Sequence, residues 1–267
     1  MSLVYNSTIL ADDTLSLPPT DRAFQYGDGL FETIRYEHGR VWFWPDHVAR
    51  LQAGMTTLHL DWPATLTADT LYNQVLDLLA RNGLMDTAAR IRLQVWRQPG
   101  GLYTPATSQT NYLLTARAGH PFAITQKPKI SIYDTFRLHN SPVSAHKTLN
   151  SLPYVLAGIY KVQQQLDDVL LLNTAGYLAE CQAANLFWLT DRVLYTPDLQ
   201  TGCVNGTARK QLLRLFPDQQ QGFFLPDVLS AADVVFSANV MGIQVFSGAF
   251  TTAQHTRLVR AFTDTTA

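Results

Sequence analysis

The spacing of hydrophobic residues changes several times along the chain, and each change predicts a different element. Aromatic and β-branched residues dominate 31–37 and 40–44, and the intervening His38-Gly39 predicts that these strands form a hairpin. Hydrophobic residues then recur at helical spacing behind Asp46, which we expect to cap a helix, and a second helix is expected at 68–82. Further strands are expected at 89–96 and 110–116.

Prolines and a glycine interrupt both periods between residues 117 and 128, so we place a domain boundary there. We expect a small α+β domain at 1–118, a linker at 119–123 and a larger α+β domain at 124–267. In the larger domain the pattern predicts helices at 149–165, at 207–215 and at the C-terminus, with strands near 129–134, 169–195, 234–236 and 243–246.

The composition is that of a globular protein and argues against several classes of partner. The 267 residues carry 15% charged side chains and a net charge of -1 without a basic run, so we expect neither nucleic acid nor an anionic membrane surface as a partner. No window approaches the ~20 apolar residues of a membrane span, and the N-terminus lacks the pattern of a signal peptide. We therefore expect a cytoplasmic protein that acts on a small molecule.

Cysteine and histidine usage argues against a metal centre. The two cysteines, Cys181 and Cys203, are too few for a disulfide framework or a Cys-rich metal site. The seven histidines are scattered without the close pairs that zinc ligands usually form. We expect no metal site.

Lys147 is the lysine best suited to chemistry. It is one of five lysines and lies in a stretch of small and polar residues, 144–150, just before a predicted amphipathic helix. A solvated surface lysine is the alternative. Ser144 and Lys147 also match the S-x-x-K pattern of serine β-lactamases, but the other motifs of that class are absent, so we treat this match as chance.

Three further segments would complement a reactive lysine. Glu180 lies in an apolar run, where a carboxylate is costly unless it meets a cation or a protonated ring nitrogen. Residues 202–209 form a tight turn that opens a helix, whose unpaired N–H groups favour a phosphate, and 237–239 form a second small, polar turn. A lysine, a buried acid and a phosphate cup are what pyridoxal 5′-phosphate (PLP) requires.

These segments, together with 21–33 and 47–51, resemble the class IV aminotransferase family, the fold-type IV PLP enzymes, nearly from end to end. The resemblance implies a two-domain α+β fold like that of D-amino-acid aminotransferases, with the cofactor between the domains. It implies that Lys147 is catalytic and holds PLP as a Schiff base, and that Glu180 pairs with the pyridine nitrogen. It further implies that the phosphate group is bound by Arg50, Gly206, Thr207, Ala208, Ser237, Ala238 and Asn239.

Simpler interpretations of the phosphate-binding residues remain open. Arg50 on a predicted helix is also explained as a surface arginine, and Gly206 as a turn former. The family commonly has Gly-Ile-Thr-Arg where this chain has 206–209 as Gly-Thr-Ala-Arg, so the hydroxyl stands one position earlier.

Within the family, 180–188 and 202–206 are most similar to the 4-amino-4-deoxychorismate lyases, which implies formation of 4-aminobenzoate and pyruvate in folate biosynthesis. An aminotransferase acting on D-amino acids or branched-chain amino acids is the alternative, and a cofactor-binding protein without activity is a third possibility. Arg97 and Tyr103 are candidates for binding a substrate carboxylate, although a solvated position also explains Arg97.

The resemblance also implies a homodimer with active sites near the subunit interface. The consecutive aromatics 42–44 are expected on the hairpin, where alternation turns some of them away from their own sheet. Packing of these aromatics against Pro45 and the following helix is the alternative.

Overall fold

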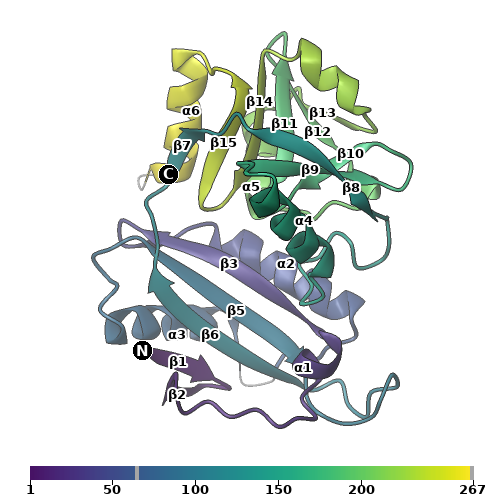
Figure 1. Cartoon of the computed structure of the whole chain (residues 1–267). Helices are drawn as coiled ribbons and strands as arrows, with labels where there is room; N and C mark the ends of the chain where they lie inside the picture. The colour runs from purple at the N-terminus through teal and green to yellow at the C-terminus, as the bar shows by residue number, and fades with distance from the viewer. Residues whose placement is uncertain (64–65, 265–267) are drawn as a thin grey trace. The chain divides into compact units, whose positions relative to one another are not determined.

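The structure, a computed structural model, describes residues 1–63 and 66–264, which form two compact units. Unit 1 comprises 1–121 and 146–150, and unit 2 comprises 122–145 and the residues from 151 onward. The break between 121 and 122 falls inside the predicted linker. Unit 1 has one sheet and unit 2 has two, and each unit has its own helices (Figure 1).

Unit 1 is built on a six-stranded sheet with the order β2-β1-β6-β5-β3-β4, in which every neighbouring pair is antiparallel. Its strands are β1 (Ser2–Tyr5), β2 (Thr8–Ala11), β3 (Gly29–Glu37), β4 (Arg40–Val41), β5 (Ala89–Arg97) and β6 (Thr110–Ala118), and its helices are α1 (Arg22–Tyr26), α2 (Trp44–Thr57) and α3 (Ala68–Arg81). The predicted strands 89–96 and 110–116 and the predicted helix 68–82 are confirmed.

The core of unit 1 lies between one face of this sheet and the helices α2 and α3 (Figure 1). Ile34 and Ile91 of the sheet and Leu71 and Leu78 of α3 are fully buried in it. Period-two alternation therefore turns the residues between them, on β3, β5 and β6, to the opposite face of the sheet.

The predicted hairpin is confirmed for its first strand, but the second strand ends at Val41 and the prediction of strand through 44 is wrong. Phe43 adopts a left-handed conformation (φ 55°) and caps α2, which begins at Trp44, so Asp46 lies in the first turn and is not the cap. Trp42 is buried and Trp44 packs on Tyr72 with ring centroids 5.4 Å apart. Trp44 thus packs against the core of unit 1, whereas Trp42 packs against the guanidinium groups of Arg35 and Arg40.

Residues 146–150 belong to unit 1, whereas the sequence analysis placed Lys147 in the second domain. The reason is backbone pairing beside the start of β3, where Phe31 N donates to Lys147 O at 2.8 Å and Leu149 N donates to Gly29 O at 2.9 Å. This extended backbone also delays the next helix, α4 (Leu152–Gln163), which begins three residues after the predicted start at 149.

Unit 2 contains two sheets, a three-stranded one ordered β10-β9-β8 and a six-stranded one ordered β13-β12-β11-β14-β15-β7. Its strands are β7 (Ala123–Gln126), β8 (Ile130–Leu138), β9 (Asp168–Asn173), β10 (Leu178–Cys181), β11 (Asn185–Thr190), β12 (Val193–Pro197), β13 (Gln220–Gly222), β14 (Val234–Asn239) and β15 (Gly242–Gly248). Besides α4, its helices are η1 (Leu199–Thr201), α5 (Thr207–Leu215), η2 (Pro226–Ala231) and α6 (Thr252–Thr263).

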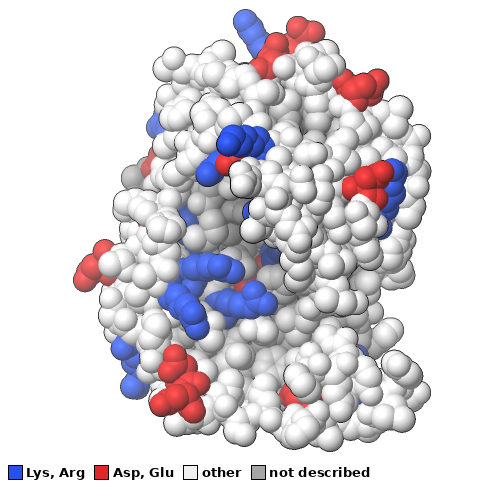
Figure 2. All heavy atoms as spheres, viewed as in Figure 1, with Lys and Arg blue, Asp and Glu red and all other residues white. Residues whose placement is uncertain are grey.

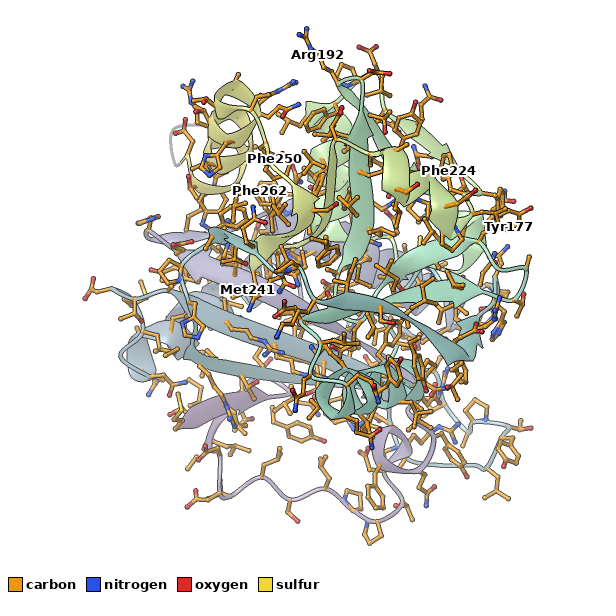
Figure 3. All side chains as sticks on the ribbon, turned by 45° about the horizontal axis from the view of Figure 1, so that its top comes forward. Tyr177, Arg192, Phe224, Met241, Phe250 and Phe262 are labelled. Atoms are coloured by element: carbon orange, nitrogen blue, oxygen red, sulfur yellow. The ribbon has the colours of Figure 1, made fainter. Side chains whose placement is uncertain are left out.

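Aromatic pairs hold the elements of unit 2 together. Phe262 of α6 stacks on Phe122 with ring centroids 4.9 Å apart, and Phe250 packs edge-on against Phe236 at 5.0 Å (Figure 3). The C-terminal helix predicted from the sequence is thus fixed to the six-stranded sheet. Among the described residues, no helix is long and apolar enough to cross a membrane.

Candidate active site

Arg50 is held by a buried carboxylate on the neighbouring strand. Glu32 lies on the helix-covered face of β3, and its Oε1 accepts a hydrogen bond from Arg50 Nε at 2.7 Å, while Arg50 Nη2 donates to Oε2. Both side chains are buried. A two-point contact between guanidinium and carboxylate fixes the orientation of the guanidinium plane, so Arg50 is a positioned group and not a mobile surface arginine.

His47 completes this cluster from the same face of α2. Its Nδ1 lies 2.6 Å from Glu32 Oε2. Burial lowers the pKa of His47, so the neutral ring donates its Nδ1–H to the carboxylate. Burial opposes the charge on Glu32, but the charge of Arg50 and the hydrogen bonds from His47 and Arg50 outweigh it and lower the pKa of Glu32 to about 2.

Lys147 lies beside the same end of β3. Its Nζ is 4.5 Å from the centre of the Phe31 ring, a cation–π distance. The preceding residue, His146, anchors the segment to α2, because its Nε2 is 2.9 Å from Thr57 Oγ1. Burial and the charge of Arg50 lower the pKa of His146, which indicates that this ring is neutral at pH 7. Lys147 is half-buried, and the residues before and after it in the chain are held by hydrogen bonds to α2 and to the start of β3.

Glu180 is buried in unit 2, as the sequence analysis expected. Its carboxylate accepts hydrogen bonds from Tyr154 OH at 2.6 Å, from Val204 N at 3.2 Å and from Asn185 Nδ2 at 3.4 Å. Burial and the charge of Glu180 raise the pKa of Tyr154, so this hydroxyl stays protonated and donates. Neutral donors thus orient the carboxylate from α4, β11 and the turn before α5.

The start of α5 contains three of the predicted phosphate-binding residues. Thr207 and Ala208 are the first residues of α5 and both are buried. The cap, Gly206, offers no side chain to the first N–H groups, and a Cβ at this position would lie 2.0 Å from Asn185 Oδ1. Thr207 Oγ1 is buried without a hydrogen-bond partner among the described residues. An uncapped helix start with a buried, unsatisfied hydroxyl favours an anion.

The second small turn lies on β14, which pairs with β11. Ser237 and Ala238 are buried there, and the Ser237 hydroxyl lies beside the thiol of Cys181. Asn239 uses its side chain to hold the chain, because its Nδ2 donates to Ala183 O at 3.1 Å and its Oδ1 accepts from Met241 N at 2.8 Å. Ser237 and Ala238 are small and buried, and the side chain of Asn239 is used in contacts within the protein, so Ser237 and Ala238 are the better candidates for lining a phosphate site.

The guanidinium group of Arg97 forms hydrogen bonds with other residues of unit 1. Its Nε donates to Asp28 at 2.9 Å, and its other two nitrogens donate to the carbonyls of Leu58, His59 and Thr107. Tyr103 is almost fully exposed and lies with Arg97 at the wall of a shallow hollow of about 380 Å³ in unit 1. The structure therefore gives Arg97 a clear structural role, and its contact with a substrate stays a prediction.

A second hollow, of about 430 Å³, lies on unit 2 and contains none of these residues. It is lined by Arg192, which Figure 3 labels, together with Phe216 and Arg257. Within residues 1–63 and 66–264, no group of three His, Cys, Asp or Glu side chains is placed to hold a metal ion.

Comparison with known proteins decides the family. Residues 29–247 match the family described as amino-transferase class IV. This chain belongs to the class IV aminotransferase family. It is 31% identical to an aminodeoxychorismate lyase of Vibrio harveyi over 87% of each chain, and 25% identical to a D-alanine aminotransferase of Listeria monocytogenes over 91% of this chain and 86% of the relative.

The fold agrees with that of solved members of the class IV family. A branched-chain aminotransferase from Thermoproteus uzoniensis, solved with norvaline, superposes with a TM-score of 0.87 at 20% identity, covering 98% of this chain and 93% of that one. The predicted fold-type IV architecture is thereby confirmed. Class IV aminotransferases are PLP enzymes, and the groups described above fit PLP: a lysine amine, a buried carboxylate, and an uncapped helix start with an unsatisfied hydroxyl.

The sequence analysis did not predict three buried or half-buried residues that contact the candidate residues: Glu32 and His47 in unit 1, and Tyr154 in unit 2. Glu32 could have been found, because it interrupts the row of apolar residues Leu30, Ile34 and Tyr36 on one face of β3. Tyr154 and His47 carry no comparable signal, since buried aromatic and histidine side chains on a helix are common in any core.

Proposed function

We propose that this class IV enzyme is a 4-amino-4-deoxychorismate lyase that forms 4-aminobenzoate and pyruvate and acts in the cytoplasm in folate biosynthesis. The observation that carries the proposal is the 31% identity to the aminodeoxychorismate lyase of Vibrio harveyi, which extends over 87% of both chains. The family resemblance of 180–188, which contains the buried Glu180, supports the same conclusion.

The residues of unit 1 and unit 2 have separate tasks in this proposal. The phosphate group of PLP is bound by Arg50, which Glu32 holds in place, and by the start of α5 at Gly206, Thr207 and Ala208. Ser237, Ala238 and Asn239 line the phosphate position. Glu180 accepts a hydrogen bond from the protonated pyridine nitrogen and keeps the proton there. When bound, PLP supplies an aldehyde that takes an amine and a ring that accepts electrons.

Lys147 carries the proton transfer. Its amine removes the proton from the amine-bearing carbon of the substrate, and the bond between the neighbouring ring carbon and the enolpyruvyl oxygen breaks as the ring becomes aromatic. The enolate that leaves takes up the proton removed by Lys147 and becomes pyruvate. The atoms balance without another reactant, since one substrate gives 4-aminobenzoate and pyruvate. Tyr154 supports this step indirectly by fixing the carboxylate of Glu180.

A parallel assay of the holoenzyme tests the proposal. We expect formation of 4-aminobenzoate from 4-amino-4-deoxychorismate at a rate well above amino-group exchange with D-alanine or L-leucine. Exchange of amino groups without 4-aminobenzoate would refute the lyase and favour the alternative, an aminotransferase for D- or branched-chain amino acids.

We further propose a homodimer, supported by the exposed face of α4. Leu152 and Val162 at the two ends of this helix are 67% and 73% exposed, and Val155, Leu156 and Ile159 between them are also exposed. These positions follow the helical period, so they form one apolar stripe of the kind that proteins bury against a partner.

Leu156→Asp is expected to weaken this dimer. In a two-fold interface both subunits contribute the same stripe, so the substitution would bury two carboxylates, one from each subunit. We expect the dissociation constant of the dimer to rise by about 30-fold, measured by light scattering across a concentration series. Gln164→Asp, which adds the same charge at the end of the same helix, is the control. A wild-type protein that is monomeric while active would contradict the dimer.

A further inference from the structure

The carboxylate of Glu180 is buried but accepts three hydrogen bonds within unit 2. Its exposed fraction is 4%, whereas Figure 2 shows other acidic side chains at the surface, where water hydrates them. Val204 N and Asn185 Nδ2 donate to Oε2 at 3.2 and 3.4 Å. Tyr154 OH donates to Oε1 at 2.6 Å. The hydroxyl of Tyr154 thus makes the shortest of the three contacts, at the length of a charge-assisted hydrogen bond.

Tyr154 is a fixed donor. Its ring packs against the cluster that includes the buried residues Tyr133 and Cys203, and Gln182 Nε2 donates to its backbone carbonyl at 3.4 Å. Burial and the charge of Glu180 raise the pKa of Tyr154, so the proton stays on the hydroxyl oxygen. The carboxylate therefore meets a neutral donor that neither ionises nor moves away.

A donor of this kind changes how strongly a carboxylate binds a proton. A hydrogen bond to the ionised form stabilises that form and makes the carboxylate a weaker base. The effect is larger in a buried site, where the effective dielectric constant is low. With Tyr154 in place, Glu180 can therefore accept a hydrogen bond from a protonated ring nitrogen without taking the proton away.

We propose that Tyr154 is a positioning residue that keeps the proton on the pyridine nitrogen of PLP by making Glu180 a weaker base. The inference rests on the proposed function, in which Glu180 accepts a hydrogen bond from that nitrogen. A protonated ring is the stronger electron acceptor, so the hydroxyl of Tyr154 also determines how readily the substrate carbon releases its proton to Lys147. Without this hydroxyl, the carboxylate competes with the ring nitrogen for the proton.

Nitrogen NMR of the enzyme loaded with isotope-labelled PLP reads the protonation state of the ring directly. We expect Tyr154→Phe to raise the ratio of neutral to protonated ring nitrogen by about 10-fold, the scale on which a hydrogen bond to a charged group contributes. The kcat should fall while KM changes little. Tyr160→Phe is the matched control, because it removes a hydroxyl from the same helix, where Tyr160 packs on Tyr133 and not on Glu180. It should leave the nitrogen resonance and kcat unchanged.

The same substitution in a Glu180→Gln background tests whether Tyr154 acts through the carboxylate. We expect Tyr154→Phe to change the nitrogen resonance and kcat little in that background, because no carboxylate is left for the hydroxyl to weaken. Equal effects of Tyr154→Phe in both backgrounds would refute the inference and show that the hydroxyl acts on packing alone.

The outcomes separate this inference from the proposed lyase activity. A ring nitrogen that responds to Tyr154→Phe, in an enzyme that makes no 4-aminobenzoate, would keep the inference and refute the lyase. A ring nitrogen that responds to Glu180→Gln but not to Tyr154→Phe would refute the inference and leave the lyase standing. A ring nitrogen that responds to neither variant would refute the inference together with the role assigned to Glu180.

Discussion

Lys147→Ala is expected to lose turnover by at least about 10³-fold, the scale on which a positioned acid–base group contributes. Lys147 is the lysine that lies beside Phe31 and in the segment held by His146 on α2, and the amine acts in the proposed mechanism both as the covalent anchor of PLP and as the base. The variant should also lose the visible absorption band of lysine-bound PLP, which spectrophotometry of the purified protein measures.

Lys129→Ala is the matched control for this prediction, because it removes an amine that lies just before β8 and has no place in the proposed site. It should keep both the absorption band and the turnover. Retention of either property by Lys147→Ala, with a normal unfolding transition, would show that another amine holds the cofactor.

Glu32→Gln is expected to lower both the stability of unit 1 and the affinity for PLP. Removing the charge leaves Arg50 buried without its carboxylate, a change that typically costs about 3 kcal/mol. Since Arg50 would also lose its fixed orientation, we expect the dissociation constant for PLP to rise by about 100-fold. Denaturant unfolding of the apoprotein and fluorescence titration with PLP measure the two effects separately.

Glu37→Gln separates the two effects, because Glu37 is a second buried carboxylate on β3 and pairs with Arg35 on the opposite face. It should cost stability but leave PLP affinity unchanged. Equal losses of PLP affinity in the two variants would mean that Glu32 acts through general destabilisation and not through Arg50.

The pH dependence of the free energy of unfolding tests whether the ionised carboxylate of Glu32 stabilises unit 1. The pKa of Glu32 is lowered from 4.5 to about 2 in the folded protein, so its stabilising contribution is complete above pH 4.5 and is lost as the pH falls toward 2. The difference in unfolding free energy between wild type and Glu32→Gln should therefore shrink across this window. A difference that stays constant down to pH 2 would contradict the assigned ion pair.

The helices and strands of the core could be predicted from the sequence, because they carry strong periodicity. Leu71, Val75, Leu78 and Leu79 recur at helical spacing, and all four are fully buried on α3. The prediction of strand through residue 44 is wrong because Pro45 favours the first turn of a helix, where it lies in α2, and this preference outweighs the β-propensity of the aromatic residues before it.

The site was predictable where a residue type is rare and its surroundings are unusual, as for Lys147 and Glu180. The partners that orient these residues were not, because they are defined by contacts between distant segments. Tyr154 and Glu180 are 26 positions apart, and Glu32 and Arg50 are 18 apart.

Because residues 146–150 belong to unit 1, this unit can complete its folding only after they have been translated. The start of β3 pairs with backbone that the ribosome makes more than a hundred residues later. Unit 1 therefore cannot finish folding when residue 121 emerges, unlike an N-terminal domain made of one continuous segment. The last part to join it carries the reactive amine, so a nascent chain displays Lys147 in its working position only after all of 122–145 has been made.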